Sequence, residues 1–206
     1  MQYLQIHPVN PQPRLISQAV AILRNGGVIV YPTDSCYALG CQIGDKAAME
    51  RIQRLRKLEP SHNFTLVCRD LSDLATYARV GNPEFRLLKS LTPGPYTFIL
   101  TASHEVPRRL QNPKRKTIGL RIPDQPIARA LLEALDEPLM SVTLILPDSP
   151  LPLSDPEEIR EQLEKQVDAF IDGGSCGNEP TSIIDLTGDA PRVVRQGKGD
   201  TSFLTA

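Results

Sequence analysis

Three consecutive polar side chains, Thr33, Asp34 and Ser35, follow an apolar, β-branched run at residues 28–31. The run begins after two glycines and is typical of a buried strand, which Pro32 ends because proline has no N–H to donate. Hydroxyl and carboxylate groups at the end of a strand can bind a polar ligand at the edge of an α/β sheet. Pro, Asp and Ser are also common turn residues, so the pattern equally fits an ordinary turn.

Cationic side chains form a second candidate feature, although the formal net charge of the chain is only −1. The three basic groups are Arg51, Arg54, Arg56 and Lys57; Arg108, Arg109, Lys114, Arg115, Lys116 and Arg121; and Arg192, Arg195 and Lys198. If these groups converge, they form a positive patch suited to phosphates, nucleotides or nucleic acid. Charge runs alone favour solvated helix faces and loops.

The composition excludes several classes of protein. Hydrophobic residues make up 40% of the chain, which indicates a globular rather than a disordered protein. No apolar run is long enough to span a membrane, and residues 1–13 are polar and proline-rich rather than a secretory signal, so we expect a cytoplasmic protein. The four cysteines form no CxxC pair and histidines are scarce, so we expect reduced thiols and no metal site built from protein side chains.

Helical and strand patterns alternate along the chain, which predicts a single α/β domain. Helices are expected at residues 14–25, 45–58, 71–77, 83–91 and 126–135, and after a capping box at 154–157. Strands are expected at residues 28–31, 64–68, 96–101, 117–122, 139–146, 167–171, 182–186 and 192–195. Connections such as 92–95 are too short for a βαβ crossover, so we expect a mixed sheet.

Six segments combine Pro, Gly, Thr, Asp and Arg in motif-like patterns. They are residues 32–40 (PTDSCYALG), 92–100 (TPGPYTFIL), 117–126 (TIGLRIPDQP), 172–174 (DGG), 180–185 (PTSIID) and 194–197 (VRQG). Together and in this order they resemble the YrdC/YciO family, the threonylcarbamoyl-adenylate synthase superfamily, and most closely its YciO branch. The resemblance implies a YrdC-like domain at residues 14–199, an N-terminal extension at 1–13 and a C-terminal tail at 200–206.

The resemblance also implies a fold and a reaction. The fold is a twisted mixed β-sheet with flanking helices around a basic concave cavity, as in YrdC/RibB-like proteins. The reaction is a nucleotidyl transfer that serves tRNA threonylcarbamoyladenosine modification. L-Threonine and bicarbonate form a carbamate, which attacks the α-phosphate of ATP to give threonylcarbamoyl-adenylate and pyrophosphate. We expect Mg²⁺ to accompany the nucleotide, because it bridges phosphate oxygens.

Individual residues match ligand-binding positions of this family. The candidates for binding threonine and carbamate are Thr33, Tyr37, Arg121 and Ser182. The candidates for binding the nucleotide are Lys57, Arg56, Ser141, Thr143 and Arg195. An arginine such as Arg121 can hold a carboxylate through two parallel hydrogen bonds, although an isolated arginine is more often part of a surface ion pair.

Two departures from the family pattern affect the phosphate-binding positions. The family's Lys-x-Arg-Pro motif reads KLEP at residues 57–60, so Glu59 replaces an arginine; in a register shifted by one, Arg56 takes the lysine position. The Ser-x-Asn motif reads TLI at residues 143–145, so Ile145 replaces an amide. Each loss could cost about two orders of magnitude in rate. We therefore hypothesise a synthase with weakened, altered or lost activity.

Two other functions fit parts of the sequence. A non-catalytic protein that binds double-stranded RNA, tRNA or a nucleotide would use the basic cavity, with RNA-binding candidates Arg108, Arg109, Lys114, Arg115 and Lys116. An activity like that of dihydroxybutanone-phosphate synthase is disfavoured, because no cluster of acidic metal ligands follows the first strand. The sequence leaves open whether Glu59 faces the cavity.

Overall fold

The computed structural model describes residues 1–59 and 62–204, which contain one sheet with the strand order β1-β8-β2-β3-β7-β4-β6-β5-β9-β10. The strands are β1 (Gln2–Gln5), β2 (Ile29–Tyr31), β3 (Ala38–Gln42), β4 (Thr65–Val67), β5 (Tyr96–Thr101), β6 (Thr117–Arg121), β7 (Leu139–Thr143), β8 (Ala169–Asp172), β9 (Ser182–Asp185) and β10 (Arg192–Arg195). The helices are α1 (Pro13–Arg24), α2 (Lys46–Arg56), α3 (Leu71–Tyr77), α4 (Asn82–Leu91), α5 (Pro126–Leu135) and α6 (Pro156–Leu163), with short 3-10 turns η1 (Arg108–Leu110) and η2 (Ser202–Leu204). Parallel pairs such as β4–β6 and antiparallel pairs such as β4–β7 occur together, so the predicted mixed sheet is confirmed.

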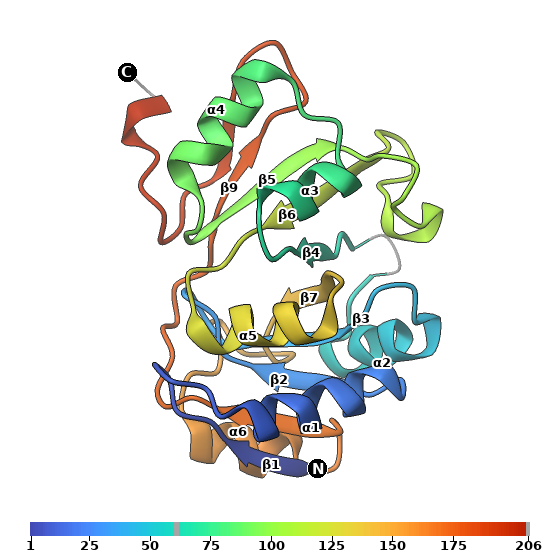
Figure 1. Ribbon diagram of the computed structural model, residues 1–206, viewed down its shortest axis with the longest axis vertical. Helices are drawn as coiled ribbons and strands as arrows, with labels where there is room; N and C mark the ends of the chain where they lie inside the picture. Colours follow the sequence, from blue (N-terminus) through green and yellow to red (C-terminus); the bar gives the residue numbers. More distant parts are fainter. Residues whose placement is uncertain (60–61, 205–206) are drawn as a thin grey trace.

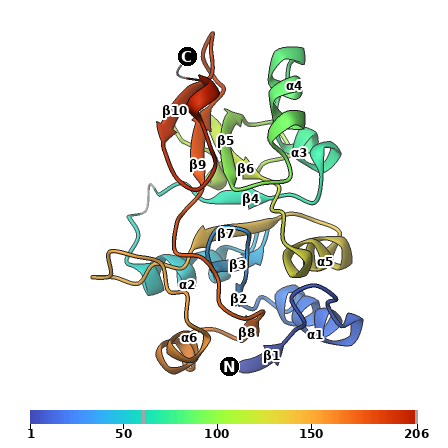
Figure 2. The same cartoon turned by 90° about the vertical axis from the view of Figure 1, so that its left-hand side faces the viewer.

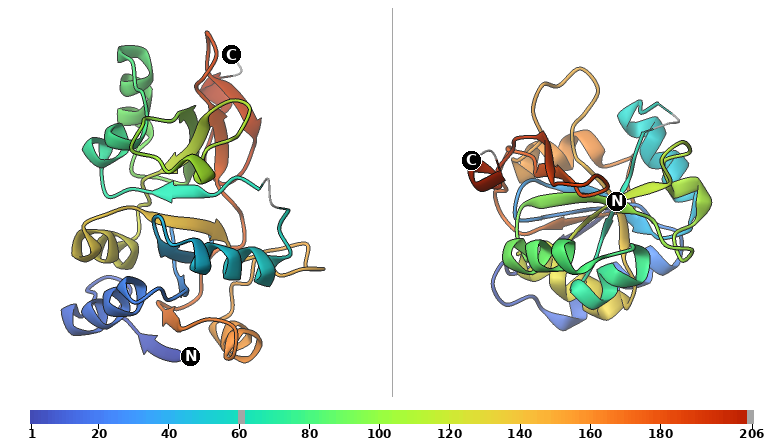
Figure 3. Two further views of the ribbon diagram at one scale, coloured as in Figure 1. Left: turned by 90° about the vertical axis from the view of Figure 1, so that its right-hand side faces the viewer. Right: turned by 90° about the horizontal axis from the view of Figure 1, so that it is seen from above.

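The sheet is divided into two groups of strands along the long axis of the molecule (Figure 1). One group is β1, β8, β2, β3 and β7, and the other is β4, β6, β5, β9 and β10; they join where β7 pairs with β4. Helices α1, α5, α3 and α4 lie along one side of the molecule, and α2 and α6 lie on the other side (Figures 2 and 3). Strands of both groups therefore meet at the centre of the molecule.

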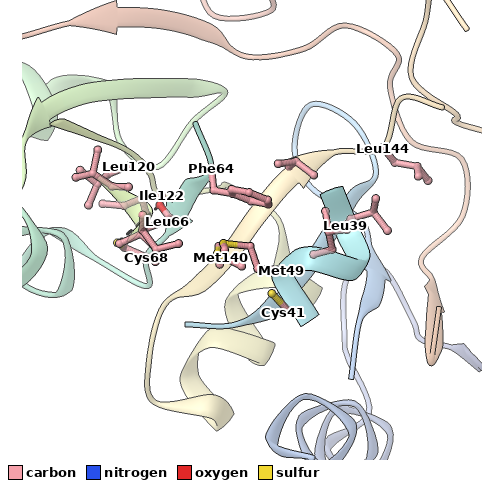
Figure 4. Packing of buried hydrophobic residues seen from close by; sticks show 14 of the residues in the cluster. Leu39, Cys41, Met49, Phe64, Leu66, Cys68, Leu120, Ile122, Met140 and Leu144 are labelled. Carbon is pink, nitrogen blue, oxygen red and sulfur yellow. Dashed lines mark hydrogen bonds between the residues drawn. The ribbon is translucent and has the colours of Figure 1, made fainter. Parts of the chain in front are cut away.

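Alternation along the strands separates a hydrophobic core from a polar face. Phe98 and Leu100 of β5 are buried in the main hydrophobic cluster together with Leu66 and Leu120 of the neighbouring strands. Figure 4 shows Leu66 and Leu120 in this packed cluster. Thr97 points to the opposite face of β5, because successive strand side chains alternate. The polar face of these strands is therefore available to line a ligand site.

Local signals set the bounds of the helices. Asp45 caps α2 by accepting a hydrogen bond from the Ala48 N–H at 2.9 Å, and Asp155 caps α6 by accepting from the Glu158 N–H at 3.0 Å. Lys57 ends α2 with a left-handed backbone at φ 50°. Helices α3 and α5 occupy the predicted residues, since a capping side chain or an early proline marks the start of each.

The sequence does not predict two of the strands, β1 and β3. β1 lies within residues 1–13 and pairs in parallel with β8, with Tyr3 opposite Phe170. Its pattern is weak because β1 is an edge strand of which only Leu4 is buried. β3 contains no β-branched residue, yet it is buried between β2 and β7. Its neighbours rather than its own strand propensity stabilise it.

Candidate functional site

A cavity of about 210 Å³, called the first cavity, lies where the two groups of strands meet. Its walls come from Thr33 and residues 35–38, from or next to β4, β5, β6, β7, β9 and β10, and from the C-terminal end of α2. Three arginines, Arg56, Arg121 and Arg195, line it, and no carboxylate does so among the described residues. The cavity is therefore basic and favours anions.

Arg121 of β6 is only 7% exposed and is held by the loop that follows β2. Its guanidinium pairs with Asp34 and donates to Ser35 Oγ at 3.3 Å. Asp34 also accepts a hydrogen bond from the Asp124 N–H at 2.9 Å. The Nε–H of Arg121 is buried and has no partner in the part of the chain that the structure describes. A buried donor without a partner is costly to the fold.

The hydroxyl of Thr33 organises this loop. It donates to the Cys36 carbonyl at 2.6 Å and accepts from the N–H groups of Ser35 and Cys36, each at 3.2 Å. This pattern of side-chain-to-backbone bonds is that of a threonine turn, so the turn interpretation describes the backbone correctly. Thr33 and Ser35 nevertheless line the first cavity, where a ligand would share their hydroxyl groups with the loop.

Two tyrosines stiffen the adjoining wall. Tyr37 lines the cavity, and its hydroxyl donates to the Gly174 carbonyl at 2.5 Å and accepts from the Gly173 N–H at 3.2 Å. Ser141, also in the wall, shares a hydrogen bond of 2.8 Å with the hydroxyl of Tyr31. Burial raises the pKa of Tyr37, and it raises the pKa of Tyr31 to about 12. Both tyrosines are therefore neutral at neutral pH.

Arg56 and Arg195 bring two further cations to the first cavity. Arg56 Nε donates to the Ile145 carbonyl at 2.6 Å, and Arg195 Nε and Nη2 donate to the Thr181 carbonyl at 3.1 and 2.7 Å. Partial burial lowers the pKa of both guanidiniums because the charged form loses hydration, but arginine remains protonated. Neutral carbonyls hold both side chains, so their charges remain available to an anion. Thr143, another nucleotide-binding candidate, lines the same cavity.

Lys57 and Glu59 do not line the first cavity. Both line an adjacent, second cavity of about 690 Å³. Lys57 Nζ is exposed and lies 3.9 Å from Asp148, a distance typical of a weak surface pair. Arg56, the residue of the shifted register, therefore lines the first cavity, whereas Glu59 does not. Pro60, the last residue of the KLEP segment, lies outside the described residues, as do residues 205–206 of the C-terminal tail.

Ser182 is not brought to the first cavity. It is completely buried, and its hydroxyl donates to the Gly199 carbonyl and accepts from the Gly197 N–H at 2.9 Å. The preceding residue, Thr181, lines the cavity, and its hydroxyl bonds Thr97 Oγ1 at 2.8 Å. A shift of one residue along the chain reverses the side to which a strand residue points, which explains the difference.

Four further polar residues line the first cavity without having been predicted: Thr65, Thr97, His62 and Asn63. Thr65 and Thr97 lie in β4 (TLV) and β5 (YTFILT), in which polar and apolar residues do not alternate strictly, so the sequence gives little signal for them. His62 and Asn63 lie outside the regular elements and carry no such signal. Burial, followed by the nearby Arg56 charge, lowers the pKa of His62.

The five candidates for RNA binding lie in η1 and in the loop that joins it to β6, and all are exposed. Arg109 donates to the Gly44 carbonyl, and Arg115 pairs with Asp185 at 2.7 Å. Arg115 lines the second cavity, whereas Arg108 and Arg109 line a third cavity of about 180 Å³. None of the five lines the first cavity, so this segment forms a separate basic surface.

Three general features of the described residues bear on function. In residues 1–59 and 62–204, no three or more His, Cys, Asp or Glu side chains gather in a way that could hold a metal ion. No helix in this part of the chain is both long and apolar enough to cross a membrane. The four cysteines are free thiols, of which Cys36, Cys41 and Cys68 are buried and Cys176 is partly exposed.

Comparisons with known proteins identify the family of this chain. Residues 21–197 match the model of the Sua5/YciO/YrdC family, which carries the description "telomere recombination". The uncharacterised protein YciO of Escherichia coli (strain K12) is 64% identical over 199 residues, 97% of either chain. The crystal structure of E. coli YciO has a TM-score of 0.95 to this protein, at 63% identity over 98% of either chain.

More distant relatives carry a functional name or a ligand. The threonylcarbamoyl-AMP synthase of Homo sapiens is 34% identical over 160 residues, 78% of this chain and 56% of that protein. P. abyssi Sua5 complexed with L-threonine has a TM-score of 0.87 at 25% identity, over 96% of this chain and 58% of that one. The family model covers most of the chain, and relatives of high identity cover nearly all of it, so the protein belongs to the Sua5/YciO/YrdC family.

Proposed function

We propose that this protein binds ATP, L-threonine and bicarbonate in the first cavity and slowly forms threonylcarbamoyl-adenylate. The observation that carries the proposal is the convergence of Arg56, Arg121 and Arg195 in one cavity that no carboxylate lines among the described residues. The synthase name of the human relative and the L-threonine in P. abyssi Sua5 support the same assignment.

The chemistry needs positioning and charge neutralisation more than a protein nucleophile. The threonine amine adds to the carbon of bicarbonate and water leaves, which gives a carbamate. Arg121 binds the threonine carboxylate, and the Thr33–Ser35 loop lies beside it. A carbamate oxygen then attacks the α-phosphorus of ATP, and pyrophosphate leaves with the electron pair of the broken P–O bond. Arg56 and Arg195 neutralise the phosphate charge.

Mg²⁺ would bind through the phosphates of ATP, since the described wall of the first cavity offers no carboxylate. It would supply additional positive charge to the triphosphate. We attribute the slow rate to Ile145, which lines the cavity with an apolar side chain where the family motif has an amide. The missing hydrogen bond lowers the rate by about a hundredfold, judged from the loss of single donors at other active sites.

A direct assay tests the proposed reaction. Purified protein is incubated with ATP, Mg²⁺, L-threonine and bicarbonate, and pyrophosphate and the adenylate are measured. We expect release of pyrophosphate that requires both threonine and bicarbonate, and its loss in Arg121→Gln. Arg129→Gln, which changes an exposed arginine on α5, is the matched control and should keep the wild-type rate. A wild-type rate equal to that without protein, or one that does not depend on threonine, contradicts the proposal.

A second candidate function is binding of double-stranded RNA or tRNA by the segment from η1 to β6. Arg108, Lys114 and Lys116 are exposed there and belong to no ion pair within the described part of the chain. The double variant Lys114→Gln/Lys116→Gln should weaken binding and reduce the slope of log affinity against log salt by about 2. RNA affinity no better than that of an unrelated protein of similar charge would rule this function out.

A further inference from the structure

The second cavity adjoins the first. Both are lined by the same stretch of wall, made of His62, Asn63, Thr65, Thr97 and Ile183. At about 690 Å³ the second cavity is also larger than the first, at about 210 Å³. A ligand bound at the three arginines of the first cavity would therefore lie next to the second cavity.

The walls of the two cavities differ in chemistry. Beyond the shared residues, the second cavity is lined largely by apolar side chains, among them Phe64, Leu110 and Ile118. Beyond the shared residues, its polar lining residues are Lys57, Glu59, Asn112, Arg115 and Thr117. Apolar walls with a few polar groups suit a flat heterocycle joined to a sugar, whereas the first cavity suits the phosphates.

We propose that the second cavity holds the nucleoside of the bound nucleotide and that Glu59 accepts hydrogen bonds from its ribose hydroxyls. This inference rests on the proposed binding of ATP in the first cavity. A carboxylate only accepts hydrogen bonds, and the ribose supplies the donors that immediately follow the phosphates. The Glu59 carbonyl accepts from the His62 N–H at 2.9 Å, which ties Glu59 to the wall that both cavities share. The replacement of a motif arginine by Glu59 then selects the sugar and does not oppose the phosphates.

The rival placement, in which Glu59 reaches the phosphates, predicts effects of the opposite sign. Removal of a carboxylate that faces phosphate relieves repulsion, so it strengthens the binding of any polyphosphate. Removal of a carboxylate that holds the ribose weakens the binding of ATP, while it changes the affinity for inorganic tripolyphosphate little. The two placements are therefore separated by the direction of the change.

Direct binding measurements by isothermal titration calorimetry test the inference. The protein, Glu59→Ala and the control Glu161→Ala, which removes an exposed carboxylate of α6, are titrated with ATP, 2′-deoxy-ATP and inorganic tripolyphosphate. We expect Glu59→Ala to weaken ATP binding about tenfold, the size of one hydrogen bond to a charged group. Its effect on 2′-deoxy-ATP should be smaller, because one partner hydroxyl is already absent. The control should match the wild type with all three ligands.

The possible failures are distinguishable. If Glu59→Ala leaves ATP binding unchanged, or strengthens the binding of both ATP and tripolyphosphate, the inference is overturned and the proposed function remains. Equal wild-type affinities for ATP and tripolyphosphate also overturn it, because the nucleoside would then contribute nothing. If the wild-type protein binds neither ligand, the proposed function and this inference fall together.

Discussion

Two regions of the first cavity differ in how their polar groups are held. In the region around Arg121, the guanidinium is fixed by Asp34 and Ser35, and its remaining Nε–H has no partner among the described residues. In the region around Arg56 and Arg195, the guanidiniums are anchored by backbone carbonyls and, for Arg195, also by the Thr181 hydroxyl at 3.4 Å. The first region is therefore shaped before a ligand arrives, whereas the second offers charge with a looser geometry.

This difference indicates which half of the ligand the protein recognises more strictly. A preorganised site loses little free energy to reorganisation when it binds. The two departures from the family motifs, Glu59 and Ile145, both fall on the nucleotide-binding motifs, and Ile145 is the residue whose carbonyl anchors Arg56. We therefore expect amino-acid recognition to be conventional for the family and nucleotide recognition to be altered.

The largest expected effect comes from Arg121→Met. The Asp34 and Arg121 side chains are only 10% and 9% exposed, so removal of one charge leaves the other buried without a partner. We expect the free energy of unfolding to fall by about 3 kcal/mol, measured by urea denaturation. Asp34→Asn/Arg121→Met should recover part of this loss. If the free energy of unfolding of the single variant falls by less than about 1 kcal/mol, the Asp34–Arg121 ion pair is as weak as an exposed pair. The two regions of the cavity would then not differ in how firmly their arginines are held.

Arg56→Gln should weaken the binding of ATP without changing the binding of threonine. The variant removes a cation held by a neutral carbonyl, so we expect ATP affinity to fall by about 2 kcal/mol, or about thirtyfold, with threonine affinity unchanged. Arg54→Gln, in the same last turn of α2 but exposed, is the matched control and should bind both ligands normally. Equal losses for threonine and ATP would mean that the regions do not act separately.

Ile145→Asn should raise the rate of the reaction by improving the region around Arg56 and Arg195. The variant restores an amide to the cavity wall, so we expect pyrophosphate release to rise about tenfold in the assay with ATP, threonine and bicarbonate. Ile145→Leu keeps the position apolar and should leave the rate unchanged. An equal rise in both variants would point to a change in packing rather than to a new hydrogen bond.

The smallest effect is a dependence of stability on alkaline pH through Tyr31, which supports Ser141 in the cavity wall. Folding raises the Tyr31 pKa from 10.0 to about 12, chiefly by burial, so the folded state favours the neutral phenol. This contribution to the free energy of unfolding is complete below pH 10 and is lost as the pH rises towards 12. The loss at pH 11 is about 1 kcal/mol. Urea denaturation at pH 8 and 11 should show a smaller loss in Tyr31→Phe; equal losses would contradict this assignment.

Some elements could be predicted from the sequence because their signals are local. Strands β5 and β10 and helices α3 and α5 occupy the predicted residues, since strand-forming composition, caps or prolines define them. β1 and β3 could not be predicted, because partners far away in the chain stabilise them. Likewise, nothing local to His62 and Asn63 indicates that they line a cavity.

The sequence by itself determined the motif segments, the mixed α/β pattern and the kinds of side chain that a basic cavity needs, because these depend on residue type and order. Only the tertiary structure decided between neighbours: Arg56 rather than Lys57 lines the first cavity, and Thr181 rather than Ser182. One step along a strand reverses the side to which a residue points, and one step at the end of a helix turns it by about 100°. Likewise, Glu59 lines the second cavity and not the first.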